Sequence, residues 1–164
     1  ADPEDKLPAI TMWLMGSLAN VSYRDVVLCA AIVLPCLIIA MALRWKMNLL
    51  SLDQDEARSL GINVKKLRLA AILLSTLMTA VTVSVCGIIG WIGLVIPHIA
   101  RLLIGNDHRS LIPASALMGS IYLLLIDTAA RAATAGEVPL SILTAMAGAP
   151  FFAVILRKTS GGRA

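Results

Sequence analysis

Side chains that could carry chemistry are sparse in this sequence and are spread along it rather than clustered. His98 follows Pro97 in a glycine-rich apolar stretch, and Asp127 and Arg131 lie four residues apart. A spacing of four puts two side chains on one face of a helix, so this acid and base can form an ion pair. An ionisable residue in an apolar stretch often marks a functional site. A lone His beside Pro more often bonds a backbone carbonyl, and we favour that structural role for His98.

No combination of residues in the sequence predicts an enzyme. It contains no nucleophile–base pair, no pair of catalytic carboxylates, and no cluster at metal-ligand spacing around His98. The phosphate-binding pattern G-x-x-x-x-G-K-[ST] is also missing, so the chain does not bind ATP in that way. The cysteines lie in apolar stretches and are interpreted as small packing residues: Cys29, Cys36 and Cys86. We predict no catalytic residue, metal or cofactor, and any active transport would draw its energy from a partner or an ion gradient.

The composition predicts that membrane helices hold these residues in place. Hydrophobic residues make up 59% of the 164 residues, charged residues make up 15%, and the mean hydropathy is +0.86. A soluble domain typically has about 25% charged residues. The apolar residues come in blocks long enough for a helix of about 20 residues to cross the hydrocarbon core. We predict an all-α, polytopic membrane helix bundle with five spans at 26–43, 67–85, 88–104, 112–130 and 138–156.

Glycines divide the longest apolar stretch, 69–100, which is too long for one crossing helix. Gly87, Gly90 and Gly93 recur every three residues, and we predict that they let neighbouring helices approach closely. Segment 7–23 precedes the first span and is apolar but interrupted by Pro, Gly, Ser and Asn. It is predicted to form a short outer-face or re-entrant helix, which is tolerated where protein or water covers it.

Lys and Arg gather on one side of this topology when the loops are assigned alternately to the two sides. That side holds eleven of the fourteen basic residues, in segments 44–68, 101–109 and 157–163. Basic residues concentrate in cytoplasmic loops, so the C-terminus is predicted to be cytoplasmic and the start of the chain to lie outside. This asymmetry explains the net charge of +4 better than nucleic-acid binding does.

The longest predicted cytoplasmic loop, 44–66, contains the signals of a short soluble helix. Ser51 or Asp53 can cap its N-terminus, and Asp55 favours the positive end of the helix dipole. Gly61 is a natural C-terminal stop. From these residues alone, the helix is equally well interpreted as a solvated connector or as a lever that docks into a cytoplasmic partner.

Taken together, several segments resemble the FecCD family of ABC importer permeases, which take up iron–siderophore complexes, haem and vitamin B12. The matching segments follow one another through nearly the whole chain, at 13–18, 48–52, 56–61, 93–101, 107–109, 127–131 and 143–152. The segments around Pro97 and Pro150 are highly specific. Family permeases are about twice this length with twice as many spans, so the resemblance implies that residues 1–164 are the C-terminal half of such a permease.

The resemblance also implies roles for particular residues. A short helix that docks in a groove of the ATPase subunit would contain Glu56, Ala57, Arg58, Leu60 and Gly61. Arg131 matches the outer-end Arg that receives acidic residues of the binding protein. Helix packing or the pathway would involve Gly87, Gly90, Gly93, Pro97, His98, Gly148 and Pro150.

The implied function is the permease component of an importer that carries ferric siderophore or a related metal chelate across the bacterial inner membrane. Its implied partners are an ABC ATPase, a periplasmic or lipoprotein binding protein, a second permease subunit and membrane lipid, without nucleic acid. The alternative is a truncated or scaffold-type membrane protein without transport activity. A proton-coupled carrier is disfavoured, because only Asp127 and His98 lie near membrane depth. The loop 44–66 discriminates among these, since only an ATP-driven permease needs a capped helix there.

Overall fold

A computed structural model describes residues 10–11, 13–19, 21–51, 63–133 and 139–160. Within these ranges the regular structure is helical and contains no strand, which confirms the all-α prediction. The helices are α2 (Tyr23–Met47), the 3₁₀ helix η1 (Asn48–Ser51), α4 (Val64–Cys86), α5 (Ile92–Ile104), α6 (His108–Ala133) and α7 (Leu140–Ser160).

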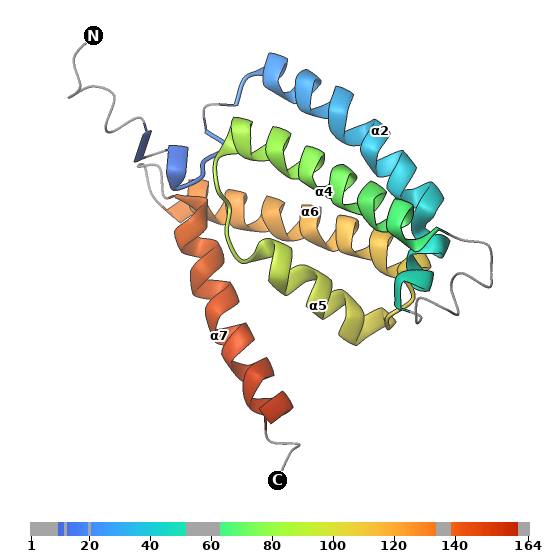
Figure 1. Cartoon of the computed structure of the whole chain (residues 1–164). Coiled ribbons are helices and arrows are strands. Elements are labelled where there is room, and N and C mark those ends of the chain that lie inside the picture. Colours follow the sequence, from blue (N-terminus) through green and yellow to red (C-terminus); the bar gives the residue numbers. More distant parts are fainter. Residues whose placement is uncertain (1–9, 12, 20, 52–62, 134–138, 161–164) are drawn as a thin grey trace.

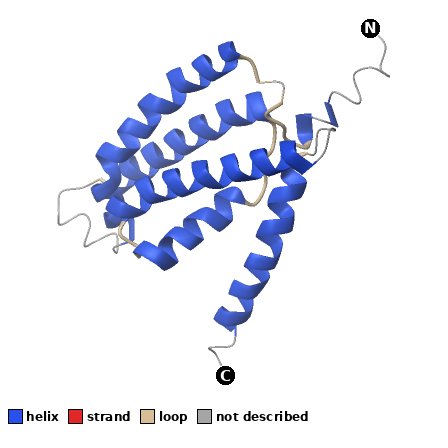
Figure 2. Ribbon diagram, turned by 180° about the vertical axis from the view of Figure 1, so that it is seen from behind, coloured by secondary structure: helices blue, strands red, loops and turns tan. Residues whose placement is uncertain are grey.

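α2, α4, α5 and α6 lie side by side, each running opposite to the one before it in the chain, and α7 diverges from them (Figure 1). α2 packs against α4 and α6, and α5 packs against α6. α7 meets α5 and α6 and then runs away from the bundle, as the view from behind also shows (Figure 2). We call the end of the bundle formed by residues 44–51 and 105–109 the Arg44 end. The opposite end, where α4 and α6 finish, is the Arg131 end.

Three helices are long and apolar enough to cross a membrane within the described part of the chain. They comprise Tyr23–Leu50, Val64–Cys86 and His108–Ala132, while Ile92–Ile104 and Leu140–Ala153 are shorter apolar helices. All five predicted spans therefore correspond to apolar helices, but their lengths differ more than the sequence suggests.

The third predicted span, 88–104, is wrong at its start, because α5 begins only at Ile92. Gly87 ends α4 with a φ of 72°, and Trp91 precedes α5 with a φ of 66°. Both values lie in the left-handed region, which a right-handed helix cannot contain. α5 therefore has 13 residues, a length of about 20 Å at 1.5 Å per residue.

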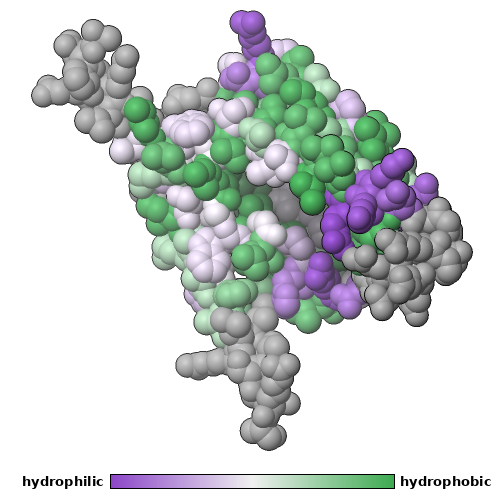
Figure 3. All heavy atoms as spheres, in the orientation of Figure 1, coloured by the Kyte–Doolittle hydropathy of each residue, from purple (hydrophilic) through white to green (hydrophobic). Residues whose placement is uncertain are grey.

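On the face seen in Figure 3, apolar side chains predominate, and hydrophilic ones gather mainly at the Arg44 end, with a smaller group where α2 begins. Ile38, Leu103 and Leu124 are each about two-thirds exposed or more. A surface of this kind suits lipid or further apolar helices rather than water. The few buried residues include Ala100 and Thr144, both completely inaccessible.

The predicted separation of basic residues is present in the described helices. Those at the Arg44 end are Arg44, Lys46, Lys65, Lys66, Arg68, Arg101 and Arg109. Only Arg24 and Arg131 are found at the opposite end within the described ranges. Because successive helices run in opposite directions, most of the described basic residues lie at the Arg44 end, as the alternate assignment of the loops predicts.

Candidate functional site

The predicted ATPase-contacting residues Glu56, Ala57, Arg58, Leu60 and Gly61 lie outside the described residues. The chain on both sides of them is described. On one side, α2 continues into η1, which ends at Ser51. On the other, Asn63 caps α4 by accepting a hydrogen bond from the Lys66 amide at 3.1 Å. The described chain is therefore helical up to Ser51 and again from Val64.

Asn48 forms a polar cross-link between the end of α2 and the start of α6. Its Nδ2 donates to Asp107 Oδ1 at 2.6 Å, and its Oδ1 accepts from the His108 backbone amide at 2.8 Å. The His108 ring Nδ1 lies 2.7 Å from the same oxygen. An amide oxygen only accepts, so Nδ1 carries the proton in this contact. We call these three residues the Asn48 latch.

Asp107 serves both the latch and the start of its own helix. Its Oδ1 also accepts from the Arg109 amide at 2.9 Å, which satisfies one of the unpaired donors at the N-terminus of α6. This amide and the Asn48 side chain hold the pKa of the carboxyl below its ordinary value of 3.8. Hydrogen bonds to the charged form favour that form, so Asp107 is a carboxylate at neutral pH.

A second contact joins α2 to α6 beside the latch. Arg44 Nη1 donates to the Arg109 carbonyl at 3.2 Å. That carbonyl lies four residues before Pro113, which has no N–H to donate to it. Arg44 therefore supplies a donor that the helix itself lacks.

At the opposite end, Arg131 pairs with Asp127 as the sequence predicts. Arg131 Nε lies 2.8 Å from Asp127 Oδ2, and the two residues are four apart on α6. The Arg131 side chain is 59% exposed and the Asp127 side chain is 21% exposed. The guanidinium is thus accessible from the Arg131 end while one of its nitrogens holds the carboxylate.

Of the three spaced glycines, Gly87 makes the close approach that the sequence predicts. A Cβ atom there would overlap the Trp13 carbonyl oxygen, and one at Gly16 would come within 2.6 Å of the Ile88 carbonyl oxygen. Both glycines have φ near 70°. The Ser17 amide donates to the Cys86 carbonyl at 3.0 Å beside them. Segment 13–17, part of the predicted outer-face helix, is thereby fixed to the end of α4.

At Gly90 and Gly93, by contrast, a Cβ atom would meet nothing within 4 Å among the described residues, so their role in packing stays a prediction. The next close approach involves Gly148 of α7 instead. Its missing side chain makes room for Trp91, whose ring also meets Phe152 edge-on at a centroid distance of 6.3 Å. Trp91 is therefore the packing residue between α5 and α7.

His98 is half-buried in α5, one residue after Pro97. The carbonyl bond expected from the sequence is not observed, since its imidazole makes no hydrogen bond in the described part of the chain. The structural role that we favour for His98 therefore stays a prediction. Pro150 lies inside α7, as Pro97 does inside α5, and neither ends its helix.

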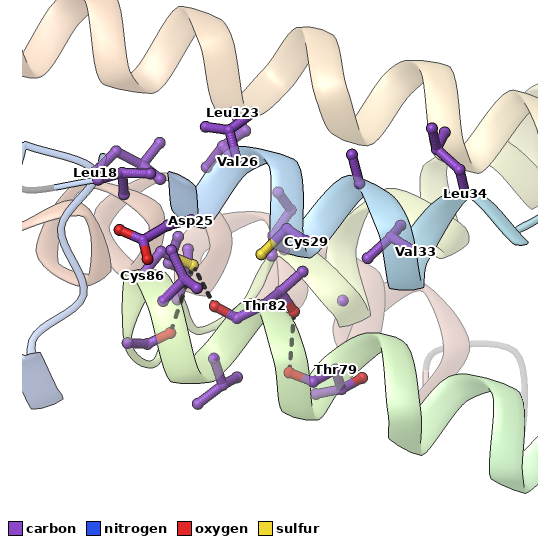
Figure 4. Close-up of a pocket in the computed structure, with 18 residues that line it drawn as sticks. Leu18, Asp25, Val26, Cys29, Val33, Leu34, Thr79, Thr82, Cys86 and Leu123 are labelled. Carbon is purple, nitrogen blue, oxygen red and sulfur yellow. Dashed lines mark hydrogen bonds between the residues drawn. The ribbon is translucent and has the colours of Figure 1, made fainter. Parts of the chain in front are cut away.

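A cavity of 710 Å³ lies between α2 and α4 and reaches Leu123 of α6 (Figure 4). Its one charged lining residue, Asp25, accepts hydrogen bonds from the Ser22 amide and hydroxyl. Thr82 and Cys86 direct their polar hydrogens to carbonyls of their own helix. Within the described ranges, no group of three His, Cys, Asp or Glu side chains could hold a metal ion. The cavity is therefore an apolar space rather than a metal site.

Three comparisons place the chain among transport proteins. The model of the FecCD transport family matches residues 2–158. The chain is 44% identical over 162 residues to the molybdate import system permease protein MolB of Haemophilus influenzae, covering 99% of this chain and 48% of that protein. It is 40% identical to the hemin transport system permease protein HmuU of Yersinia pestis, covering 94% of this chain and 47% of that one.

A solved structure agrees with both relatives. It is described as an inward-facing metal-chelate type ABC transporter, and it superposes with a TM-score of 0.91 at 45% identity. The match covers 96% of this chain and 51% of the other. The chain thus spans about half the length of the relatives it matches. The resemblance drawn from the motifs is confirmed: this multi-pass membrane chain belongs to the FecCD transport family.

Proposed function

We propose that the chain is the C-terminal half of the permease domain of an ABC importer for a metal chelate. The observation that carries this proposal is the superposition of 96% of the chain on a metal-chelate type ABC transporter. A ferric siderophore is our proposed cargo, with haem, cobalamin and molybdate as the competing cargoes suggested by the relatives. The missing half of the permease would contribute the remaining spans.

The proposed orientation places the Arg44 end in the cytoplasm of a bacterium and the Arg131 end outside its inner membrane. The gathering of basic residues at the Arg44 end supports this orientation. Segment 52–62 then faces an ABC ATPase, which hydrolyses ATP for the transport subunit. The accessible guanidinium of Arg131 faces the binding protein.

Transport would proceed by alternating access. Closure of the ATPase dimer moves the 52–62 segment, and the membrane helices rock to open the pathway. A second permease subunit completes the pathway.

Reconstitution of the complete permease tests this function. Vesicles containing the permease and its ATPase, supplied with the binding protein and ATP, should accumulate labelled ferric siderophore. Unlabelled haem, cobalamin and molybdate, added singly, identify the cargo by competition. A preparation that accumulates none of the four would favour the non-transporting scaffold instead.

A further inference from the structure

Two segments that the proposed function leaves without a role are joined in the structure. Segments 48–52 and 107–109 are separate matches to the FecCD family in the sequence, and the Asn48 latch connects them across 59 residues. Asn48 begins η1, which ends immediately before segment 52–62, and its partners Asp107 and His108 stand at the start of α6. Its position suggests a mechanical role rather than a binding one.

Asn48 is well suited to join two helices because it uses both ends of its side-chain amide. The nitrogen donates to Asp107 and the oxygen accepts from His108, so the contact fixes orientation as well as distance. The Asp107 partner is a carboxylate, and hydrogen bonds to charged groups are the stronger kind. The Arg44 contact to the Arg109 carbonyl adds a second point of attachment. The two attachments, one from the end of α2 and one from the start of η1, resist rotation of this junction against α6.

α6 extends from the latch to the opposite end of the bundle. It has 26 residues, a length of about 39 Å at 1.5 Å per residue. Asp107 and His108 stand at its start, and the Asp127–Arg131 pair stands in its last two turns. Pro113 lies near the start of the helix, and Arg44 satisfies the carbonyl that it leaves unpaired. Displacement of η1 would therefore be passed to a single continuous helix.

We propose that Asn48 is a positioning residue that carries movement of the ATPase-facing segment into α6 and so to the surface that receives the binding protein. This inference rests on the proposed function, because it assumes an ATPase at segment 52–62 and a binding protein at Arg131. Asn48 would then couple the Arg44 end of the bundle to the Arg131 end.

The test compares two asparagines in the complete permease, reconstituted with its ATPase and binding protein. Asn48→Ala removes the latch, and Asn106→Ala makes the same chemical change in the neighbouring turn, where the side chain forms no hydrogen bond within the described residues. Asn48→Ala should leave basal ATP hydrolysis unchanged. It should reduce the stimulation by loaded binding protein about tenfold, the usual scale of coupling between two sites. Asn106→Ala should retain full stimulation.

A covalent replacement separates coupling from folding. In a background without the native cysteines, Asn48→Cys combined with Asp107→Cys should be poorly stimulated when reduced and should regain stimulation when oxidised. Asp107→Cys alone should not respond to the oxidant. The coupling role of the latch would be overturned if Asn48→Ala and Asn106→Ala showed equal stimulation of ATP hydrolysis. Equal stimulation of the oxidised and the reduced double variant would also overturn it. In either case, ATP-dependent uptake by the wild type would leave the proposed function standing. Absence of wild-type ATP-dependent uptake would overturn both.

Discussion

Gly148 of α7 and Trp91 before α5 are packed so closely that no side chain fits at Gly148, where an added Cβ atom would lie 2.7 Å from the Trp91 Cβ. Trp91 cannot easily move away, because it also contacts Phe152 and holds a positive φ at the start of a helix. The contact holds the middle of α7 against the start of α5.

Gly148→Ala is therefore expected to destabilise the chain. Overpacking of this kind costs about 1–3 kcal/mol. Thermal unfolding in detergent should show a lower midpoint for this variant. Gly93→Ala is the matched control, since a Cβ atom there meets nothing within 4 Å and Ala favours a helix over Gly. Similar midpoints for the two variants would contradict the close packing at Trp91.

Acid should weaken the fold through Asp107. Its pKa is held below 3.8 in the folded chain by the Arg109 amide and the Asn48 side chain. Between the lowered and the ordinary pKa, the unfolded chain binds more protons than the folded one. The stability gained from Asp107 is therefore complete at a pH above the ordinary pKa. It is lost as the pH falls through the lowered pKa. Melting curves from neutral to strongly acidic pH should show a shallower acid decline for Asp107→Asn, and identical declines would exclude this role.

The orientation can be read from two introduced cysteines. Gln54→Cys lies in the loop assigned to the cytoplasm, and Gly136→Cys lies in the short connection after α6. In a background lacking the native cysteines, an impermeant thiol reagent should label them from opposite sides of the membrane. Labelling of both positions from one side would refute the alternating topology.

The proposed ATPase contact predicts a loss of coupling from changes in segment 52–62. Glu56→Lys reverses a charge near the expected helix N-terminus, and Gly61→Pro disturbs its stop. Both should reduce substrate-stimulated ATP hydrolysis in the complete permease without impairing membrane insertion. Gln54→Ala serves as a control within the same loop. Wild-type uptake in both variants would show that the loop is only a connector.

Arg131 is expected to hold a carboxylate of the binding protein. Its half-buried partner Asp127 competes weakly, because Arg131 itself is exposed and ion pairs at a surface are typically worth less than about 1 kcal/mol. Arg131→Glu should weaken docking, and a matching acid-to-base change on the binding protein should partly restore it. Arg131→Lys should fall between, because a point charge lacks the two parallel hydrogen bonds of a guanidinium.

The matched control for this docking experiment is Arg24→Glu, an exposed basic residue at the same end of the bundle. Affinity measured at low salt, where electrostatic effects are least screened, gives the most sensitive comparison. If Arg131→Glu and Arg24→Glu reduce affinity equally, only the general charge of the surface matters. Unchanged affinity in the Arg131 variant would leave it as an anchor for α6.

The sequence predicted the features that depend on residues close together in the chain. Apolar blocks identified the helices, and a spacing of four identified the Asp127–Arg131 pair. The Asn48 latch was missed because its partners lie 59 and 60 residues apart, and no periodicity links such positions. The only signal for the latch was that segments 48–52 and 107–109 both match the FecCD family. That match indicated membership of the family and did not predict a contact between the two segments.

The role of Trp91 was missed for a different reason. Glycine spacing suggested that Gly87, Gly90 and Gly93 act alike, whereas only Gly87 faces a neighbouring backbone. Trp91 packs against Gly148 and Phe152 of α7, and contacts so distant in the chain leave no trace in the sequence of this segment. The start of α5 was misplaced because Trp91 has a positive φ, which the sequence does not reveal either.

The 13-residue length of α5 bears on how the chain enters the bilayer during synthesis. A segment needs about 20 apolar residues to be stable as an independent crossing. α5 falls short of this, and among the described helices it packs mainly against α6 and α7, which are both made after it. We therefore expect the ribosome-bound chain to retain α5 in the insertion machinery until α6 emerges, so that the two helices leave it together as a preformed hairpin.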